Sequence, residues 1–407
     1  MRSKDRVRMA FDHVEPDRVP VFEIHINTRP ASEILGRPVQ GMGGADIGIK
    51  RNKMIAEGRA DEFYRRDMET RMELCQTLEL DIIRAFPYPV DPLVPRQTGE
   101  NLWRIEDKHG YWWCFRYAAD GDLYMESDSC IKQGGVDRFE QLVNDMEKHG
   151  TTLLGCAIDG LPIVSQSGGG GPSLEGTSFS SLEWAGKTDP DLCVMGWADI
   201  GFYHNSWMEV LLEAMASRPE LVDRWMAMNL QQVLLQLETQ LKLGADLILG
   251  GQDICYRNGP MFSPRHYERF IKPGLLAITE MCHEYDIPYL RHNDGNITAI
   301  EESFLLESGI DGWHAIEPCA GMDIFYFKDK YGDRITLAGN IDCGGSLESG
   351  TPEEIRNEVR EKIKHCAPGG GYIIASSNSI HSAISGRNYQ IMLEAIAEFG
   401  SYPINLA

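Results

Sequence analysis

The stretch PYLRHNDGNITAI, residues 288–300, begins as a short apolar run and ends in polar and charged side chains. His292, Asn293 and Asp294 stand side by side at the change, before a glycine and a pattern typical of a helix. A buried strand that ends in an imidazole and a carboxylate is typical of a parallel sheet with a site at its carboxyl edge. The same arrangement recurs along the chain, and this recurrence predicts the fold.

Short apolar runs alternate with helical patterns through the C-terminal half of the sequence. Each run is bounded by Gly, Pro, Asn or Asp, as expected of a strand buried on both faces. Between the last two runs, Thr351, Pro352 and Glu354 predict the start of a helix with a capping box. The predicted strands are 245–251, 287–292, 312–318, 335–342 and 372–379, with earlier candidates at 19–25, 81–88, 152–158 and 161–167.

The spacing of these runs predicts an α/β fold, a (β/α)8 TIM barrel. In the C-terminal half the strand starts lie roughly 23 to 43 residues apart, the length of a strand followed by a crossover helix. The total is near eight, and a doubly wound sheet is disfavoured because no Gly-rich dinucleotide turn follows the first run. Residues 97–131 alternate aromatic and polar side chains, which predicts an antiparallel hairpin inserted into the barrel. We expect one TIM-barrel domain over residues 1–407.

Composition and charge exclude several classes of function. The chain has 407 residues, 43% hydrophobic and 25% charged, as in globular proteins with a large core. Its net charge of −22 argues against nucleic acid and anionic membrane surfaces as partners. The ten cysteines are scattered without a C-x-x-C pair, which indicates reduced thiols. Without a signal-like N-terminus or a long apolar segment, we expect a cytoplasmic protein.

Polar and ionisable side chains follow most of the predicted strands. In a TIM barrel the carboxyl ends of all strands meet at one rim, so these side chains are expected to converge there. Burying so many carboxylates and imidazoles costs several kcal/mol each unless they are paired, metal-bound or hydrated. The set comprises Glu23, His25, Asn27, Ser165, Ser167, Gln252, Asp253, His292, Asp294, Glu317, Asn340, Asp342, Ser376, Ser377, Asn378 and His381.

Each member of this set has a structural alternative. A lone aspartate after a strand is commonly a helix cap or turn former, an asparagine suits a left-handed turn, and a lone histidine is commonly a satisfied core residue. The GGGGP segment, Gly168–Pro172, lacks the Lys-Ser/Thr of a phosphate loop and predicts a loop over the barrel mouth. Cys319 and Cys343 are weaker thiolate candidates. Aromatic side chains for an apolar pocket, or for the core, are Trp112, Trp113, Phe202, Tyr203, Trp207 and Tyr256.

Together, eight short motifs resemble the uroporphyrinogen decarboxylase superfamily. The resemblance runs along nearly the whole chain, is dense after residue 240, and implies a TIM barrel. The motifs are EPDRVPV (15–21), HNDGN (292–296), EPCAGMD (317–323), GNID (339–342), GTPEEI (350–355), APGGGYI (367–373), SSNSIH (376–381) and FGSYP (399–403).

Two chemistries occur in the superfamily that this sequence resembles. True uroporphyrinogen decarboxylases carry an arginine-rich segment after the first strand and an aspartate at the end of the second. Here the first segment contains Arg29 alone, and the second ends in RAFPYPVD. The resemblance therefore points to the other branch, the corrinoid-dependent methyltransferases, which include the methyltransferase components of O-demethylases.

In the coenzyme M enzymes of that branch, a His-x-Cys pair and a later cysteine hold zinc. This sequence keeps the histidine as His292 but has Asp294 for the first cysteine, and Ser376 and Ser377 near the last strand. A His/carboxylate set is harder than a thiolate set and suits an oxygen leaving group. We therefore expect methyl transfer from a methylated small molecule, with a methoxylated aromatic as the best candidate, to the Co(I) corrinoid (cobalamin) of a partner protein.

Roles for individual residues follow from this expectation. We expect His292, Asp294 and Glu317 to act as acid catalyst and orienting groups, or as the metal ligands if zinc is present. The residues expected to bind substrate are Glu23, His25, Asp253, Asn340, Asp342, Asn378, His381 and Tyr256. The alternatives are a decarboxylase for a smaller substrate and a non-catalytic barrel that binds a corrinoid protein. The sequence leaves open the methyl donor, the direction of transfer and the oligomeric state, a homodimer included.

Overall fold

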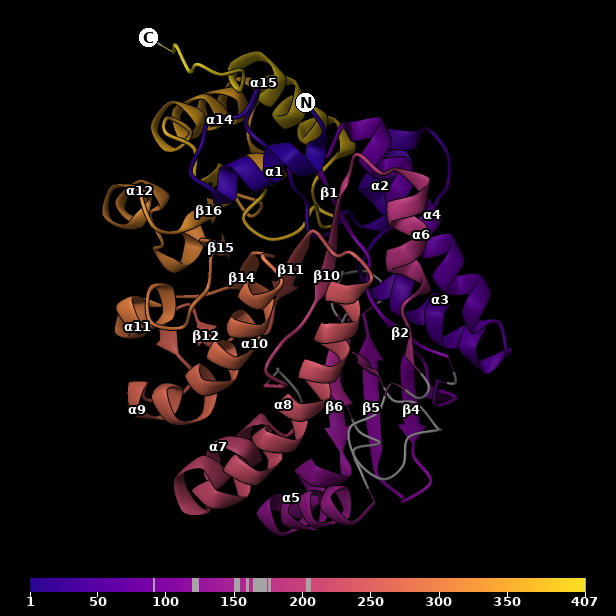
Figure 1. The fold of residues 1–407 in the computed structure, drawn as a ribbon. Coiled ribbons are helices and arrows are strands. Elements are labelled where there is room, and N and C mark those ends of the chain that lie inside the picture. Colours follow the sequence, from indigo (N-terminus) through magenta and orange to yellow (C-terminus); the bar gives the residue numbers. More distant parts are fainter. Residues whose placement is uncertain are drawn as a thin grey trace.

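Parallel strands form the centre of the molecule (Figure 1). The computed structural model describes residues 1–90, 92–118, 124–149, 154–158, 161–163, 174, 177–202 and 206–406. Seven strands form one sheet in the order β1-β10-β11-β14-β15-β16-β17. Their bounds are β1 Ile82–Arg84, β10 Cys193–Trp197, β11 Leu247–Gly250, β14 Tyr289–Asn293, β15 Gly312–Ala315, β16 Thr336–Ala338 and β17 Tyr372–Ile373.

Residues 19–26 close this sheet into a barrel. Val21 and Ile26 make parallel bridges to Ile374 and Ile380, which lie at and beyond the end of β17. On its other side, the Val21 carbonyl accepts the amide proton of Asp81 at 2.9 Å, directly before β1. The segment therefore takes the eighth place, between β17 and β1, and the TIM-barrel prediction is confirmed.

Helices follow the strands and cover the outside of the barrel (Figure 1). The capping box predicted at Thr351 and Glu354 is present at the start of α14. No helix among the described residues is long and apolar enough to cross a membrane. The helices are α1 Ser3–Phe11, α2 Thr28–Leu35, α3 Ala45–Ala56, α4 Ala60–Leu78, α5 Cys130–His149, α6 Ser180–Thr188, α7 Met208–Ser217, α8 Pro219–Lys242, α9 Pro264–His266, α10 Lys272–Glu284, α11 Glu301–Leu305, α12 Ile324–Tyr331, α13 Ser346–Ser349, α14 Pro352–Cys366 and α15 Gly386–Phe399.

Two apolar layers follow from the alternation of side chains along each strand. Leu247, Leu249 and Leu290 belong to a small cluster inside the barrel, together with Val7 and Ala10 of α1, which closes the amino end. The intervening residue Ile248 belongs to the large cluster between the strands and the helices. Side chains two residues beyond Leu290 therefore face the barrel interior again, at its carboxyl end.

Two of the strand candidates from the sequence are wrong as barrel strands. The runs at 152–158 and 161–167 are not barrel strands, because β7 (Leu154–Ile158) and β8 (Leu161–Ile163) pair antiparallel with each other. The third barrel strand is instead β10, which pairs in parallel with β1 and β11. Ser165, Ser167 and the segment Gly168–Pro172 lie outside the described residues.

The predicted insertion is confirmed and is larger than one hairpin. β3 (Arg96–Gly99), β4 (Leu102–Glu106), β5 (Trp112–Tyr117) and β6 (Tyr124–Ser129) form a four-stranded antiparallel sheet. Trp103, Ile105 and Trp113 bury one face of this sheet in the large apolar cluster. In Figure 1 the sheet extends from the barrel beside α5. Short two-stranded pairs complete the described strands: β2 (Tyr88–Pro89) with β9 (Thr177–Ser178), and β12 (Cys255–Tyr256) with β13 (Gly259–Pro260).

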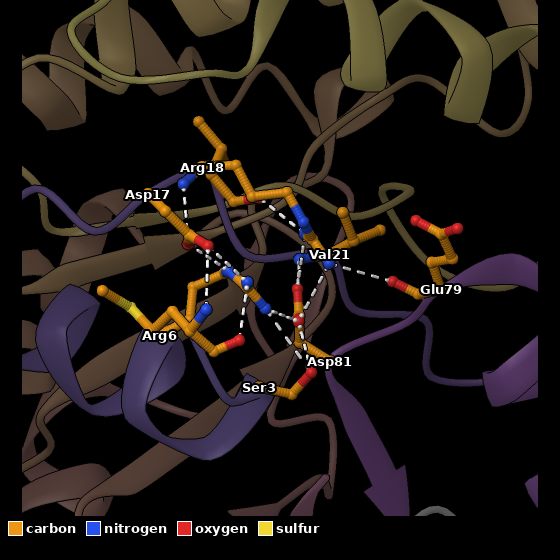
Figure 2. A network of polar contacts seen from close by, with 9 residues as sticks. Ser3, Arg6, Asp17, Arg18, Val21, Glu79 and Asp81 are labelled. Atoms are coloured by element: carbon orange, nitrogen blue, oxygen red, sulfur yellow. Dashed lines mark hydrogen bonds and ion pairs between the residues drawn. The ribbon is translucent and has the colours of Figure 1, made fainter. Parts of the chain in front are cut away.

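A buried carboxylate joins α1, the first barrel segment and β1 at the amino end of the barrel (Figure 2). The fully buried Asp81 accepts hydrogen bonds from Arg6 at 2.6 Å, from Arg18 at 2.7 Å and from the Val21 amide at 2.7 Å. Ser3 donates a further bond at 2.7 Å. These contacts fix the closing segment against its neighbour, because each partner belongs to a different part of the chain's first 21 residues.

We expect Asp81→Asn to lower the free energy of unfolding by about 3–5 kcal/mol, because it leaves two arginines without their buried counter-charge. Denaturant unfolding measures this change. The matched control is Asp12→Asn, which removes an exposed partner of Arg8 at the C-terminal end of the same helix, α1, and should cost about 1 kcal/mol or less. Equal, small effects of both substitutions would contradict the role of Asp81 in closing the barrel.

Candidate active site

The strand alternation brings ionisable side chains to the carboxyl end of the barrel interior. Leu290 faces the interior, so His292 and Asp294 follow on the same side of β14. Asp253 follows Leu249 in the same way at the end of β11, the neighbouring strand. His314 lies opposite His292 in the parallel register of β14 and β15. Three adjacent strands thus deliver two imidazoles and two carboxylates to one place.

Asp253, His292 and Asp294 form the tightest cluster of this kind among the described residues. One ligand atom from each lies within 4.8 Å of the others. His292 Nε2 is 3.6 Å from Asp253 Oδ1 and 3.7 Å from Asp294 Oδ2. These separations exceed hydrogen-bond range, so the three groups surround a point between them without bonding one another through Nε2.

His292 is buried and makes its ring contact on the opposite side. Its Nδ1 atom lies 2.8 Å from Nδ1 of His314. Burial lowers the pKa of His292 to about 3, and Arg291, Arg84 and His25 add to this effect. Burial likewise lowers the pKa of His314 well below its usual range. Both imidazoles are therefore neutral at ordinary pH, and a neutral imidazole nitrogen can bind a metal ion.

Asp294 has the opposite electrostatic situation. Although 21% of its side chain is exposed, burial and the neighbouring Asp253 and Glu317 carboxylates raise its pKa well above the usual value. Asn378 donates a hydrogen bond to Oδ2 at 2.5 Å, and Oδ1 is buried without a partner among the described residues. A proton on this carboxyl, or a cation beside it, would relieve the repulsion.

Glu317 is connected to this cluster through the backbone after β14. Its Oε2 atom accepts the Gly295 amide proton at 2.8 Å, and the Cys319 thiol donates to Oε1 at 2.8 Å. Gly295 adopts a φ of +83°, and a side chain there would lie 2.7 Å from the Tyr256 carbonyl oxygen. The glycine of the HNDGN motif is therefore required by a positive φ and a close approach of two backbone segments.

Arg84 and His25 form a second pair of side chains near His292 and His314. Arg84, at the end of β1, donates from Nη1 to His25 Nε2 at 2.6 Å and to the Ile24 carbonyl at 2.6 Å. Since arginine can only donate, His25 accepts at Nε2 and donates from Nδ1 to the Met42 carbonyl at 2.7 Å. The positive charge of Arg84 contributes to the low pKa values of His292 and His314.

Four of the other predicted substrate-binding residues, Glu23, Asn340, Asp342 and His381, have hydrogen-bond partners outside the Asp253, His292 and Asp294 cluster. Glu23 lies in the layer beneath α15, where it accepts a hydrogen bond from Ser376 at 2.7 Å, and burial raises its pKa to about 8. Asp342 accepts the Gly344 amide proton in its own turn. Asn340 donates to the Ile316 carbonyl, and His381 contacts the Cys343 carbonyl. The half-exposed Tyr256 belongs to the β12–β13 hairpin.

The sequence predicts that Glu317 is a metal ligand together with His292 and Asp294. In the structure, Glu317 is not part of the group of possible ligand atoms. Asp253 takes that place, while the Glu317 carboxylate bonds the Gly295 amide and the Cys319 thiol. Of the aromatic candidates, Trp113, Phe202 and Trp207 are buried in the large core cluster, and Tyr203 lies outside the described residues. The positions of Trp113, Phe202 and Trp207 therefore indicate core packing rather than pocket walls.

Sequence reasoning missed Arg84 and His314. Both lie within predicted strands, at 81–88 and 312–318, where polar residues were sought only at the ends. A polar side chain inside an apolar run, on the same side as the residue that ends the neighbouring run, is the signal that could have identified them.

Comparisons with known proteins agree with this architecture. Residues 204–399 match the family model of uroporphyrinogen decarboxylase (URO-D), and this range contains Asp253, His292, Asp294, His314 and Asn378. This match supports the resemblance of the C-terminal half of the chain to the uroporphyrinogen decarboxylase superfamily. Uroporphyrinogen decarboxylase of Alkalilimnicola ehrlichii is 26% identical over 187 residues, 44% of this chain and 47% of the relative.

Two further comparisons extend this result. Uroporphyrinogen decarboxylase of Pseudoalteromonas translucida is 27% identical over 172 residues, 40% of this chain and 45% of the relative. The chain thus spans about half the length of the curated relatives it matches. A methyltransferase from Methanosarcina mazei has a similar structure, with a TM-score of 0.59 and 15% identity over 98% of this chain and 99% of that one. This likeness shows the common fold.

The donor atoms of the Asp253, His292 and Asp294 cluster fit a divalent cation. The neutral imidazole of His292 and the carboxylates of Asp253 and Asp294 are ligand types that zinc and manganese accept. The partnerless Asp294 Oδ1 atom is a buried acceptor that a cation would satisfy. A His/Asp/Asp set contains no thiolate, so it favours harder cations and oxygen ligands over sulfur ligands.

We expect Gly295→Ala to lower the free energy of unfolding by about 2–4 kcal/mol, because it combines a left-handed conformation with contact against backbone atoms. The control is Gly321→Ala, which has a similar φ of +79° but no atom within 4 Å of the added carbon. That variant should lose only about 1–2 kcal/mol. Thermal or denaturant unfolding compares the two, and equal losses would contradict the close approach at Gly295.

Binding of Zn²⁺ or Mn²⁺ should release a proton from Asp294 at pH values below its raised pKa. The raised pKa means that the free carboxyl holds a proton that a cation must displace, whereas His292 is already deprotonated and contributes none. Calorimetry in buffers of different ionisation enthalpy counts the released protons. Release should decrease as the pH rises, vanish in Asp294→Asn and persist in the surface control Asp329→Asn. Equal proton release by the wild-type protein and by Asp294→Asn at every pH tested would contradict this prediction.

Proposed function

We propose that this protein is a methyltransferase that removes a methyl group from a small methylated molecule and passes it to the corrinoid of a partner protein. A methoxylated aromatic is the best candidate for the donor. The observation that carries the proposal is the His/Asp/Asp cluster formed by Asp253, His292 and Asp294, which suits a departing oxygen. The similar fold of the Methanosarcina mazei methyltransferase supports it.

The reaction makes a specific demand on the protein. The carbon–oxygen bond of the ether breaks as the methyl carbon is transferred, and the oxygen leaves with the electron pair of that bond. Such an oxygen must be protonated or bound to a Lewis acid as charge develops. The Co(I) corrinoid of the partner supplies the nucleophile, and the chain supplies stabilisation of the leaving group.

The side chains of the cluster divide this task. Asp294 can hold the proton that the departing oxygen takes up, because its pKa is raised. The low pKa of His292 excludes it as a proton donor at neutral pH and makes it a ligand or hydrogen-bond acceptor. A divalent cation held by Asp253, His292 and Asp294 would supply Lewis-acid stabilisation of the oxygen. Asn378 keeps the Asp294 carboxyl oriented through its hydrogen bond.

The alternative, decarboxylation, is favoured by the names of the curated relatives. A tetrapyrrole with many carboxylates would need a basic cradle after the first strand. The single arginine there, Arg29, is exposed and pairs with Glu33 at 2.9 Å. The end of β1 carries Arg84 and Phe86 and no carboxylate. These features favour methyl transfer over decarboxylation of that substrate.

A methyl-transfer assay tests the proposal. Reduced corrinoid protein is mixed with the enzyme and with methoxyarenes, methylamines or methylthiols, and cobalt methylation is followed optically. We expect transfer from a methoxyarene and a rate loss of about 10²–10⁴-fold in His292→Ala. The control is His365→Ala, a surface histidine paired with Asp329. Unchanged transfer by His292→Ala would contradict the site, and carbon dioxide release without corrinoid would favour the decarboxylase.

A further inference from the structure

Two buried imidazoles contact each other directly beside the candidate site. His292 and His314 are paired in register on β14 and β15, and their exposed fractions are 6% and 0%. Their Nδ1 atoms lie 2.8 Å apart, and the ring centroids are separated by 5.0 Å. At this distance the two nitrogens share one hydrogen, so one Nδ1 donates and the other accepts.

The surroundings of His314 determine which ring donates. Its Nδ1 atom is occupied by His292, and the backbone of Ser376 lies within reach of the ring as a weak hydrogen-bond partner. The Nε2 atom is buried and has no hydrogen-bond partner of normal geometry among the described residues. The Ser376 backbone raises the pKa of the His314 ring, as an acceptor does, and Nδ1 is already engaged by His292, so the His314 proton is favoured on Nε2 and Nδ1 is left as an acceptor.

The surroundings of His292 lead to the same direction. If His314 Nδ1 accepts, the proton of His292 lies on Nδ1 and its Nε2 atom carries a lone pair. That Nε2 atom is 3.6 Å and 3.7 Å from the Asp253 and Asp294 carboxylates, too far to donate a normal hydrogen bond to either. The same three side chains form the group whose ligand atoms lie within 4.8 Å of one another.

We propose that His314 is a positioning residue: its Nδ1 atom accepts the Nδ1 proton of His292 and so reserves the Nε2 lone pair of His292 for a divalent cation held with Asp253 and Asp294. The inference rests on the cation of the proposed function, but not on the identity of the methyl donor. His314 itself touches neither cation nor substrate. Its effect is to fix the ring orientation and the tautomer of a ligand.

This role has an energetic consequence. A free neutral imidazole in water prefers its proton on Nε2, the nitrogen that a cation would need here. Binding would then require a change of tautomer and a rotation of the ring in a buried site. A partner that holds the Nδ1 proton removes that cost beforehand, and loss of such a partner typically weakens metal binding 10–100-fold.

The tautomer can be measured without any methyl donor. Nitrogen-15 NMR of the histidine-labelled, cation-free protein distinguishes a protonated ring nitrogen from an unprotonated one, and His292→Ala assigns the signals of His292. We expect a protonated Nδ1 and an unprotonated Nε2 at His292. A protonated Nε2 in the wild-type protein would overturn the proposal. This measurement does not depend on whether any His314 variant folds.

Substitution separates positioning from packing. His314→Phe keeps a ring of similar shape without the acceptor, and His314→Asn returns an acceptor oxygen near the place of Nδ1. We expect His314→Phe to shift His292 toward Nε2 protonation and to weaken Zn²⁺ binding, measured by calorimetry, at least about tenfold. His314→Asn should retain the wild-type tautomer and bind Zn²⁺ more tightly than His314→Phe. The matched control, His283→Phe, alters an exposed histidine paired with Asp311 and should change neither.

The outcomes distinguish this proposal from the methyltransferase proposal. If His314→Phe folds, as judged by its thermal unfolding, yet leaves the His292 tautomer and Zn²⁺ affinity unchanged, the positioning role is overturned. The positioning role would also be overturned if Asp253→Asn and His292→Ala both bind Zn²⁺ as tightly as the wild-type protein. If the NMR and binding results are as expected but no methylated donor reacts, the positioning role stands and the methyl-transfer function fails.

Discussion

The buried ion pair between Asp199 and Arg291 holds the strand ends that form the candidate site. Both side chains have no exposed surface, and Arg291 Nη1 donates to Asp199 Oδ2 at 2.5 Å. The same carboxylate accepts the amide protons of Gly251 and Gln252, while Arg291 also donates to the Gln252 carbonyl. One pair thus fixes the ends of β10, β11 and β14 relative to each other. Because an unpartnered buried charge costs several kcal/mol, these strand ends have little freedom to move apart.

Neighbouring residues of β14 have different roles: Arg291 holds the strand ends in place, and His292 belongs to the candidate site. Arg291 and His292 are neighbours, and the alternation of β14 sends them to opposite sides. Arg291 bonds the backbone of the preceding strand, and His292 faces the barrel interior beside Asp253. The buried Asp199–Arg291 pair therefore lies directly behind His292. Support of this kind can hold ligand atoms within about 0.5 Å of the geometry that binding requires.

Much of this arrangement could be predicted from the sequence. Alternating apolar runs and helices predicted the barrel, and polar residues after the runs predicted Asp253, His292, Asp294 and Asn378 near one another. Local pattern could not show which side a residue faces once the strand is irregular, so Glu23 was placed at the mouth although it lies beneath α15. The local pattern also favoured the runs within 152–167 over Cys193–Trp197 as the source of a barrel strand. Both regions contain short apolar runs, and only pairing with β1 and β11 distinguishes them. His314 was missed because its importance comes from a neighbour on another strand.

The chemical character of the cluster depends on the carboxylate of Asp294, which stands where the coenzyme M enzymes have a cysteine thiolate. A thiolate beside the histidine would transfer electron density to a bound cation and favour a sulfur substrate, whereas a carboxylate leaves the cation harder. The charged form of Asp294 is repelled by the Asp253 and Glu317 carboxylates, and either a proton or a cation would remove this repulsion. Both of these are electrophiles that a departing oxygen can use. A site built in this way would stabilise negative charge on oxygen whichever of the two it holds, and this is the physical basis of the proposed preference for an ether over a thioether donor.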